Sequence, residues 1–525
     1  MGGKLRAVLG DVIADHEPVT ITFSLAFRQL EAASAAAADM LRACAFLAPD
    51  AIPEEIFVSG AEAMGENLAR MAGGGINLVK ILREAGRFSL IRRNAKGRTI
   101  EIHRLVQQVL RGEMDNDTRR LWAERIVRGQ EISFPTLEHS HWSLCERLLP
   151  HAQEAARLIK EHRLEFIEAA WLLIKAGTYC ISRSQYIEAE QLLVQALGIY
   201  EKVLGPDHRD VAMSLNNLAY LYSEQGKYAE AEPFYERALS IHEKALGPDH
   251  PDVATSLNNL ASLYNEQGKY GEAERLLVQA MIVREKALGS DHPVVAQSFN
   301  NLATLYDQQG RYAEAEQFFV RAISIYEKAL GPDHKDVATG INNLASLYNH
   351  QGKYAEAEPL FLQALNIREK ALGPDHPDVA QTLHNMGFLY NHQGKYDEAE
   401  RLYARALNIR EKALGPDHPA VAMGLNNLAT LYLKQGMYVK AEPFHIRSLS
   451  ILEKALGPDH PNVAFFLNNL ASLYYEQGKY SEAEPLYLRS LSILIKALGP
   501  DHPNTDLIRR NYTEILRIIA NKTQE

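Results

Sequence analysis

The sequence has few cysteines and no long apolar run, and each shortage argues against a class of protein. Its 525 residues include three cysteines, Cys44, Cys145 and Cys180, which lie far apart and form no Cys-x-x-Cys pair. Nothing therefore indicates a disulfide framework, and we expect three reduced, buried thiols. No stretch of about 18 apolar residues occurs, and the N-terminus lacks the apolar core of a signal peptide. We expect a cytoplasmic protein with no membrane partner.

The sequence also lacks the short motifs that mark common catalytic sites. It contains no Gly-x-x-x-x-Gly-Lys-Ser/Thr phosphate loop, no Gly-x-Ser-x-Gly, no Ser/His/Asp order and no zinc signature. Paired carboxylates such as Glu272 and Glu274 recur regularly on a solvated helix face, which is not expected of a unique site. We predict a protein that is not an enzyme and that uses no cofactor and no metal.

Positive charge is scarce in the C-terminal two thirds of the chain. Residues 1–162 balance 21 Lys/Arg against 21 Asp/Glu, whereas residues 163–525 hold 35 against 45. The formal net charge of −10 therefore falls on the second segment. A long acidic surface repels a phosphate backbone, so nucleic acid is disfavoured as a partner of this segment.

What the chain does have is a strict internal repeat. The turn Gly-Pro-Asp-His, once Gly-Ser-Asp-His, recurs every 42 residues without insertion or deletion, at Gly205, Gly247, Gly289, Gly331, Gly373, Gly415, Gly457 and Gly499. A fixed period of this length is typical of a solenoid, in which each unit presents the same surfaces to its neighbours. The turn histidines, His208 through His502, lie too far apart in sequence to converge on a metal, and we expect packing or helix capping from them.

Each unit has the pattern of two antiparallel helices, which we call helix A and helix B. In the unit that begins at Pro251, the proline suits a first helical position and Gly268 supplies a left-handed stop. Tyr270 then begins the second helical pattern, which Gly289 ends. Seven full units run from about 209 to 498, preceded by one degenerate unit and followed by a closing helix over residues 505–520.

These units resemble tetratricopeptide repeats, here longer than usual. The phrase Leu-Asn-Asn-Leu-Ala-x-Leu-Tyr-x-x-Gln-Gly-Lys-Tyr-x-Glu-Ala-Glu, closed by Gly-Pro-Asp-His-Pro, is similar to the 42-residue repeats of kinesin light chain over residues 205–502. The resemblance implies a mostly all-α fold, a right-handed α-solenoid that binds other proteins. A kinesin light chain would also carry a heptad coiled coil ahead of its repeats, and this chain has none.

The segment before the repeats combines helical patterns with one hairpin. Apolar periodicity predicts helices over Thr22–Leu47, Leu78–Glu84 and Arg104–Leu110. A β-hairpin is predicted from Arg87 to His103, with a polar turn in its middle. Helices followed by a hairpin and a further helix are typical of a winged-helix module.

This segment resembles the winged-helix region of STAND-type signalling NTPases of the NB-ARC class that carry tetratricopeptide repeats. The matching stretches are residues 45–57, 88–91 and 102–107. In that family a histidine at the position of His103 senses the phosphates of bound ADP. Since the phosphate loop is missing here, His103 is either a structural residue or a nucleotide-sensing remnant, and we interpret the chain as this architecture without its nucleotide-binding domain.

The resemblances and the composition together predict the division of the chain. We expect an N-terminal tail over 1–20, a winged-helix-like module over 21–130, a helical linker over 131–162, a degenerate first repeat over 163–204, seven 42-residue repeats over 205–498 and a C-terminal capping helix over 499–525.

One stripe of helix A is predicted to line the inner, concave surface of the solenoid. On a helical wheel it carries Thr255, Asn259, Ser262 and Glu266, opposite the apolar side. The second of these positions is always asparagine: Asn217, Asn259, Asn301, Asn343, Asn385, Asn427 and Asn469. Asparagine costs roughly 0.6 kcal/mol in a helix relative to alanine, so a compensating role is expected. Either these amides bind the backbone of a peptide, or they bond to the backbone of the neighbouring repeat, or the row reflects simple duplication of an ancestral unit.

Positions of this stripe that differ between units are candidates for ligand specificity. They include Thr304, Ser346 and Phe388 at one position, and His350, His392 and Lys434 at another. The groove becomes less acidic toward its middle, which favours a peptide with an acidic residue near the fourth to sixth repeats.

We therefore predict an interaction scaffold that captures a peptide or protein segment, as the sensor part of a STAND-type signalling protein. Two alternatives remain open. In the first alternative, the chain is a cargo adaptor of the kinesin-light-chain kind. In the second, it is a regulator that contacts DNA through Arg92, Arg93, Lys96 and Arg98 of the hairpin. The sequence does not indicate an oligomeric state.

Overall fold

The computed structural model describes residues 17–72 and 77–524. Helices make up most of this part of the chain. The chain divides into two compact units, Met1–Ile181 with Ile187–Pro206, and Ser182–Tyr186 with Asp207–Glu525, and each is described by itself. Among the described residues, no helix combines the length and the apolar character that a membrane crossing needs.

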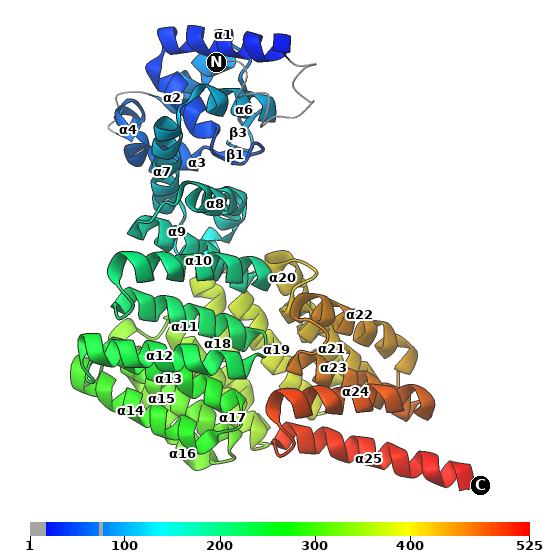
Figure 1. The fold of residues 1–525 in the computed structure, drawn as a ribbon. Coiled ribbons are helices and arrows are strands. Elements are labelled where there is room, and N and C mark those ends of the chain that lie inside the picture. The colour runs from blue at the N-terminus through cyan, green and yellow to red at the C-terminus, as the bar shows by residue number, and fades with distance from the viewer. Residues whose placement is uncertain (1–16, 73–76, 525) are drawn as a thin grey trace. The chain divides into compact units, whose positions relative to one another are not determined.

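The first unit begins with a long helix, continues with short ones and ends with longer ones (Figure 1). They are α1 (Glu17–Ala33), α2 (Ala35–Cys44), α3 (Glu55–Ser59), α4 (Glu66–Ala72), α5 (Leu78–Gly86), α6 (Arg104–Glu113), α7 (Asn116–Ser133), α8 (Trp142–His162), α9 (Ile167–Ser182) and α10 (Tyr186–Leu204), with 3-10 turns η1 (Ala61–Met64) and η2 (His139–His141). Ser182 and Tyr186, at the facing ends of α9 and α10, belong to the second unit.

The prediction of one helix over Thr22–Leu47 is wrong, because the chain breaks at Ser34 into α1 and α2. Ser34 has an extended backbone, and its Oγ accepts a hydrogen bond from the backbone N–H of Ala37 at 3.3 Å. A serine N-cap can interrupt an alanine-rich pattern without any change in its apolar periodicity. The predicted helices at residues 78–84 and 104–110 are confirmed as α5 and α6.

A three-stranded antiparallel sheet joins these helices. Its strands are β1 (Ile52–Pro53), β2 (Ile91–Asn94) and β3 (Thr99–Ile102), in the order β1-β3-β2. Strands β2 and β3 pair from Ile91↔Ile102 to Asn94↔Thr99, which confirms the predicted hairpin. The winged-helix interpretation of this module stays a prediction.

All three cysteines are free and buried, as expected. Desolvation raises the pKa of each thiol, to about 11 at Cys145 and about 12 at Cys180. Thiols with such a raised pKa are protonated at neutral pH and are poor nucleophiles.

The second unit consists of paired helices in strict alternation and one closing helix. Helices A are α11 (Arg209–Glu224), α13 (Pro251–Glu266), α15 (Pro293–Gln308), α17 (Lys335–His350), α19 (Pro377–His392), α21 (Pro419–Lys434) and α23 (Pro461–Glu476). Helices B are α12 (Tyr228–Leu246), α14 (Tyr270–Leu288), α16 (Tyr312–Leu330), α18 (Tyr354–Leu372), α20 (Tyr396–Leu414), α22 (Tyr438–Leu456) and α24 (Tyr480–Leu498). The closing helix is α25 (Pro503–Gln524).

The repeated turn residues set where these helices begin and end. At each of the eight turns the histidine Nδ1 accepts a hydrogen bond from the backbone N–H two residues later, as from Asp252 to His250 at 3.1 Å. The turn histidines are therefore helix caps. Gly268 (φ +71°) and Gly289 (φ +85°) end helices A and B in a backbone conformation that glycine adopts without strain.

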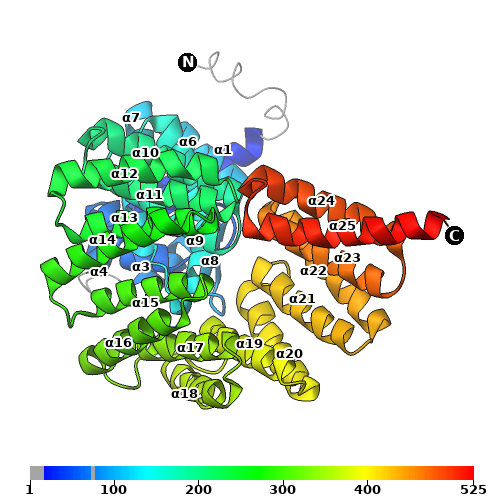
Figure 2. The same cartoon turned by 90° about the horizontal axis from the view of Figure 1, so that it is seen from below.

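Helices A lie on the inner side of the curve and helices B on the outer side, as α15 to α20 show in Figure 2. Alanines such as Ala261, Ala273 and Ala280 are fully buried where the helices cross. Successive units are also joined by a repeated polar contact, in which the Tyr306 hydroxyl donates to Glu274 of the preceding unit at 2.9 Å. The same bond recurs at Tyr348, Tyr390, Tyr432 and Tyr474.

Residues about 236 positions apart meet in the second unit, because the solenoid completes a superhelical turn. His460 Nε2 donates to the carbonyl oxygen of Glu224 at 3.0 Å, and His418 Nε2 donates to that of Ser182 at 3.2 Å. A Cβ at Gly226 would lie 2.4 Å from Cδ of Pro461, and one at Gly268 would lie 2.8 Å from Cδ2 of His502. We call this contact the seam; it consists of Ser182, Glu224, Gly226 and Gly268 against His418, His460, Pro461 and His502.

Candidate functional site

The predicted inner stripe of helix A is accessible to solvent. In α13, Thr255, Ser262 and Glu266 are exposed, and Asn259 is half-buried. The same half-burial holds for all seven members of the asparagine row: Asn217, Asn259, Asn301, Asn343, Asn385, Asn427 and Asn469. The row is thus neither buried within the units nor fully exposed.

The asparagines form a side-chain ladder from unit to unit. Nδ2 of Asn343 donates to Oδ1 of Asn300 in the preceding helix A at 3.3 Å. The equivalent bond leaves Asn301, Asn385 and Asn469, and it continues from Asn511 of α25 to Asn468. Asn427 donates instead to the ring of His384, which occupies the acceptor position in α19, at 3.0 Å.

This ladder offsets the helix-propensity cost of asparagine in the units that form it. Each bond contributes about 1 kcal/mol, which is of the same size as the cost. The neighbouring repeat therefore provides a partner, although it is a side chain and not the backbone that the sequence suggested. Apart from Asn385, which also donates to Ser346 Oγ at 3.5 Å, each ladder amide retains a second N–H. Peptide binding by this row stays a prediction.

The hydroxyls predicted at the variable positions bond to their own helix. Thr304 Oγ1 donates to the carbonyl oxygen of Asn300 at 2.9 Å, and Ser346 Oγ donates to that of Asn342 at 3.0 Å. Their oxygens can still accept a hydrogen bond from a ligand.

His350 pairs with an acid that the sequence did not single out. Its Nδ1 lies 2.9 Å from Oδ2 of Asp307 in the preceding helix A, and this hydrogen bond raises the pKa of His350. Asp307 is mostly enclosed, with a side chain 12% exposed. This histidine and its partner therefore form a local ion pair when the ring is protonated.

Phe388 and His392 form one aromatic spot on α19. Phe388 is 40% exposed, and its ring meets that of His392 edge-on with centroids 4.4 Å apart. Burial and then Lys434 lower the pKa of His392. Lys434 itself is exposed on α21.

Three buried arginines on helices B were not predicted and bring positive charge close to the inner surface. Arg284, Arg368 and Arg410 are 4–5% exposed, and none forms a salt bridge with another described residue. Arg368 Nη2 donates to Thr339 Oγ1 at 3.1 Å, and Arg410 Nη2 donates to Gln381 Oε1 at 2.9 Å. Both acceptors belong to the inner stripe, where Gln381 is exposed and Thr339 is half-buried.

Burial outweighs the electrostatic compensation of these arginines, of which Arg368 has some from Asp378. Desolvation lowers the pKa of all three, that of Arg410 to about 10. The Nε groups of Arg284 and Arg368 have no hydrogen-bond partner. A comparison of the units at this position of helix B could have found them, because Leu452 and Leu494 occupy it in the last two units.

A continuous hydrogen-bonded path links one arginine to the asparagine ladder. Gln381 accepts from Arg410 and donates through Nε2 to Asn385 Oδ1 at 3.0 Å. Asn385 then donates to Asn342 of the preceding unit at 3.3 Å. A ligand that contacts Asn385 or Gln381 would therefore also affect the environment of Arg410.

In the first unit, His103 acts as a helix cap. Its Nδ1 accepts a hydrogen bond from the backbone N–H of Leu105 at 3.2 Å at the start of α6. This is a structural role, and the nucleotide-sensing alternative stays untested. On the hairpin, Arg93 donates to Glu54 at 2.6 Å, so one of the four basic side chains proposed for DNA contact is held in an ion pair.

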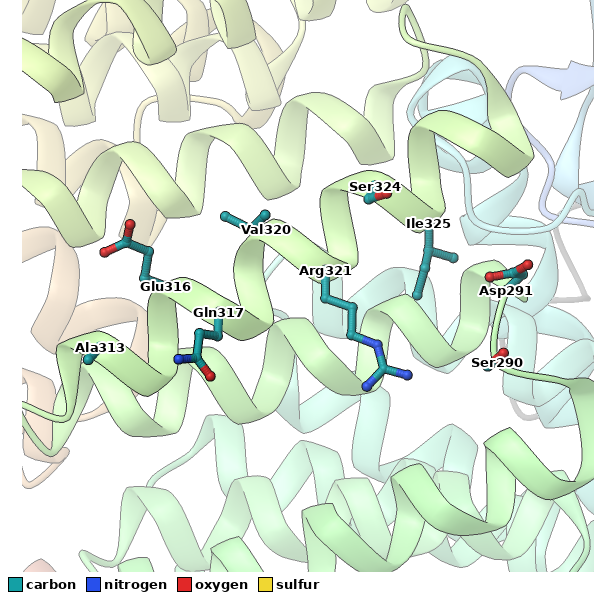
Figure 3. Close-up of a pocket in the computed structure, with 9 residues that line it drawn as sticks. All are labelled: Ser290, Asp291, Ala313, Glu316, Gln317, Val320, Arg321, Ser324 and Ile325. Atoms are coloured by element: carbon teal, nitrogen blue, oxygen red, sulfur yellow. The ribbon is translucent and has the colours of Figure 1, made fainter.

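The outer surface also carries a hollow, of about 710 Å³, beside α16 (Figure 3). Two of the charged groups that line it already have partners. Arg321 donates to Glu285 at 3.0 Å, and Glu316 accepts from Tyr348 at 2.9 Å. In the described residues, no group of three or more His, Cys, Asp or Glu side chains is arranged to hold a metal ion. The inner surface is therefore the better candidate site.

Comparison with known families assigns the repeats. The model of the tetratricopeptide repeat matches the chain at residues 168–244, 210–281, 252–328, 336–391, 378–445, 421–496 and 466–525, which together cover more than half of its length. The chain belongs to the tetratricopeptide-repeat family. A model described as a domain of unknown function, DUF7779, matches residues 28–119 of this repeat protein. No curated protein matches the chain.

Solved structures with similar repeats come from several kinds of protein. A putative kinesin light chain from Podosopora anserina is 29% identical, with a TM-score of 0.34 over 39% of this chain and 98% of that one. A STAND protein with a tetratricopeptide repeat sensor from Pyrococcus horikoshii is 15% identical, with a TM-score of 0.46 over 88% and 64%. A Rap protein complexed with Competence and Sporulation Factor is 17% identical, with a TM-score of 0.47 over 68% and 97%.

Proposed function

We propose that this repeat protein is a non-enzymatic scaffold that binds an extended peptide or protein segment along the inner surface of its repeats. The repeat family and the regular row of accessible amide side chains support this role. An extended segment offers a donor and an acceptor at every residue, and asparagine side chains carry both groups.

One observation carries the proposal further, to a segment with an acidic residue near α17 to α21. Arg368 and Arg410 bring buried positive charge beside Thr339 and Gln381, and no carboxylate of the described chain pairs with it. A buried charge without a counter-charge is unfavourable, so a ligand carboxylate at this place would be stabilised. Lys434 adds a further positive charge to the same stretch of the inner surface.

The experiment uses the full chain and two pools of nine-residue peptides with random flanks. One pool has Asp or Glu at its centre, and the other has Asn or Gln. Fluorescence anisotropy should show at least tenfold tighter binding of the acidic pool, and R368M/R410M should abolish that preference. The matched control is R405M/R447M, because these arginines lie on helices B but pair with Glu369 at 2.5 Å and Glu411 at 2.8 Å. Equal binding of both pools by the unaltered chain contradicts the acidic-segment proposal.

The asparagine row has its own test in the same assay. Changing Asn301, Asn343 and Asn385 together to alanine should weaken both peptide pools alike, since these amides contact any backbone. If binding survives these changes in a folded protein, the row serves only as the ladder between units.

We further propose that the scaffold is the sensor part of a STAND-type signalling protein. What supports this is the order of a helical module with a hairpin before the repeats, together with the motif matches around residues 45–57 and 102–107. The test is co-purification of the chain with a phosphate-loop NTPase whose nucleotide hydrolysis changes when the repeats bind their peptide. A motor protein or a DNA fragment bound instead would favour the cargo-adaptor or the DNA-contacting alternative.

A further inference from the structure

A small cavity of about 260 Å³ opens on the inner surface next to the seam. Its walls come from the C-terminal ends of α11 and α13, from α12, and from the start of α23, which lies one superhelical turn away. The side chains that matter for its chemistry are Tyr220, Tyr228, Tyr235, Glu224, Glu266 and His460.

Two carboxylates face this cavity, and neither has a positive partner. Glu224 and Glu266 are reachable by solvent and form no salt bridge with another described residue. Desolvation by the walls raises the pKa of each carboxyl. At Glu224 a hydrogen bond from Tyr220 opposes this rise in pKa, and the charge of Glu266 adds to it. The nearby lysines are directed elsewhere: Lys227 lies over the ring of Tyr222, and Lys269 pairs with Glu232.

The histidine in the wall does not supply the missing charge. His460 Nδ1 accepts from the backbone N–H of Asn462 at 3.0 Å, and its Nε2 donates to Glu224 O at 3.0 Å. Both bonds fit the neutral ring, and burial lowers the pKa of His460 to about 4. At neutral pH His460 therefore adds no positive charge beside the two carboxyl groups of the cavity.

Three tyrosine rings complete the cavity. Tyr228 and Tyr235 are buried and Tyr220 is 47% exposed, and burial raises the pKa of all three phenols, so they are uncharged. Aromatic ring faces attract cations, and the attraction is greater where water is partly excluded. The tyrosine rings and the carboxylates thus both favour a cation in the cavity.

This combination occurs at one place among the repeats. The position of Glu224 and Glu266 holds Gln308, His350, His392 and Lys434 in the next units, so adjacent acids occur once. Glu476 in α23 has tyrosines at the matching positions of α24, and Glu514 of α25 acts on one of them, Tyr487, as well. It differs in that Ser472 occupies the position of Tyr220 and that Glu514 already accepts a hydrogen bond from Tyr475 at 3.2 Å. It provides a natural half-site for comparison.

We propose that this cavity binds an ammonium or guanidinium group, presented by the segment that lies along the inner surface. The cation would lie between the two carboxylates and against the tyrosine rings, and the acidic residue of the same segment would lie farther along, near Arg368 and Arg410. That the cation belongs to a bound segment rests on the proposed function. That the cavity favours a cation follows from its own side chains.

The experiment measures small probes on the full chain by calorimetry and by saturation-transfer NMR. The probes are N-acetyl-lysine amide, N-acetyl-arginine amide and alanine amide, which separate a lysine, an arginine and an N-terminal amine as the source. N-acetyl-norleucine amide is the uncharged control. At least one cationic probe should bind tenfold or more tightly than the norleucine probe. Equal binding of all four probes overturns the proposal.

Variants locate the bound probe. E224Q/E266Q keeps the shape of both side chains and should weaken the cationic probe at least tenfold, whereas E476Q should change it less than twofold. Tyr220→Ser, the residue that α13 carries at this position, should weaken it about three- to tenfold. If E224Q/E266Q is folded by circular dichroism and binds the probe unchanged, the cavity is not the site.

The same variants separate this inference from the proposed function. E224Q/E266Q should lose the cationic probe but keep the preference for acidic over amide-centred peptides, because the arginines are untouched. R368M/R410M should do the reverse. If the unaltered chain shows no preference for acidic peptides but still binds the cationic probes, the acidic-segment proposal is contradicted. The assignment of the cavity as a cation site would then still stand.

Discussion

The units at the seam and the units in the middle of the solenoid have nearly the same sequence but different surroundings. Gly226 and Gly268 each face a turn that begins more than 230 residues later, whereas Gly352 and Gly394 have the same left-handed backbone and open space around them. The cavity between Glu224 and Glu266 also lies beside the seam and takes part of its wall from His460. A repeated residue therefore acquires a role from its place in the superhelix, in addition to the role it has within its own unit.

The largest expected effect comes from filling the seam. Gly226→Ala and Gly352→Ala impose a similar backbone strain, because φ is +68° and +73° at the two positions. Only the first also places a methyl group 2.4 Å from Cδ of Pro461. We expect Gly226→Ala to lower the free energy of unfolding by about 1–3 kcal/mol more than Gly352→Ala does, measured by urea denaturation. Equal losses would show that the two turns do not touch in solution.

Acid should weaken the seam through His460, which is 6% exposed. Burial lowers its pKa in the folded protein to about 4, below the value of about 6.5 of an unfolded histidine. The unfolded chain therefore binds more protons between these values, so this contribution is complete above pH 6.5 and is lost as pH falls toward 4. At pH 5 the loss is about 2 kcal/mol.

The matched variant is His460→Asn, because asparagine also caps a helix but does not titrate. The difference in unfolding free energy between pH 7.5 and pH 5 should be about 2 kcal/mol smaller in the variant than in the unaltered chain. An unchanged difference would mean that this histidine is already solvated and that the seam is open.

The ends of the helices could be predicted from the sequence because the residues that set them act locally. Pro251, Gly268 and Gly289 have the same effect in any chain, and each lies where the pattern placed it. The inner stripe followed from the same periodicity. Even so, Ser34 broke an expected helix, because a single cap competes with an alanine-rich pattern of weak amphipathicity.

The seam and the buried arginines could not be predicted in the same way. Contact between Gly226 and Pro461 depends on a small rotation at every intervening unit, and no local pattern determines that sum. Because arginine is charged, the sequence alone favours a solvent-facing place for Arg368 on its helix B. In the structure Arg368 lies between the helices and is 5% exposed. A unit-by-unit comparison of helix B would have shown arginine in three units at a position that holds His242, Tyr326, Leu452 and Leu494 in the others.

The smallest expected effect on stability is the difference between an asparagine in the ladder and one outside it. Asn385 bonds to Asn342, Ser346 and Gln381, whereas Asn217 in the first full unit makes no side-chain bond to another described residue. Asn217→Ala should therefore raise the free energy of unfolding by roughly 0.6 kcal/mol, the gain in helix propensity. Asn385→Ala should lower it by about 1 kcal/mol, because lost hydrogen bonds outweigh that gain. Urea denaturation of both variants measures these changes, and opposite signs would show that the ladder stabilises the fold at Asn385. If both variants are stabilised, the ladder contributes nothing, and the asparagine row would have to be explained by what it binds.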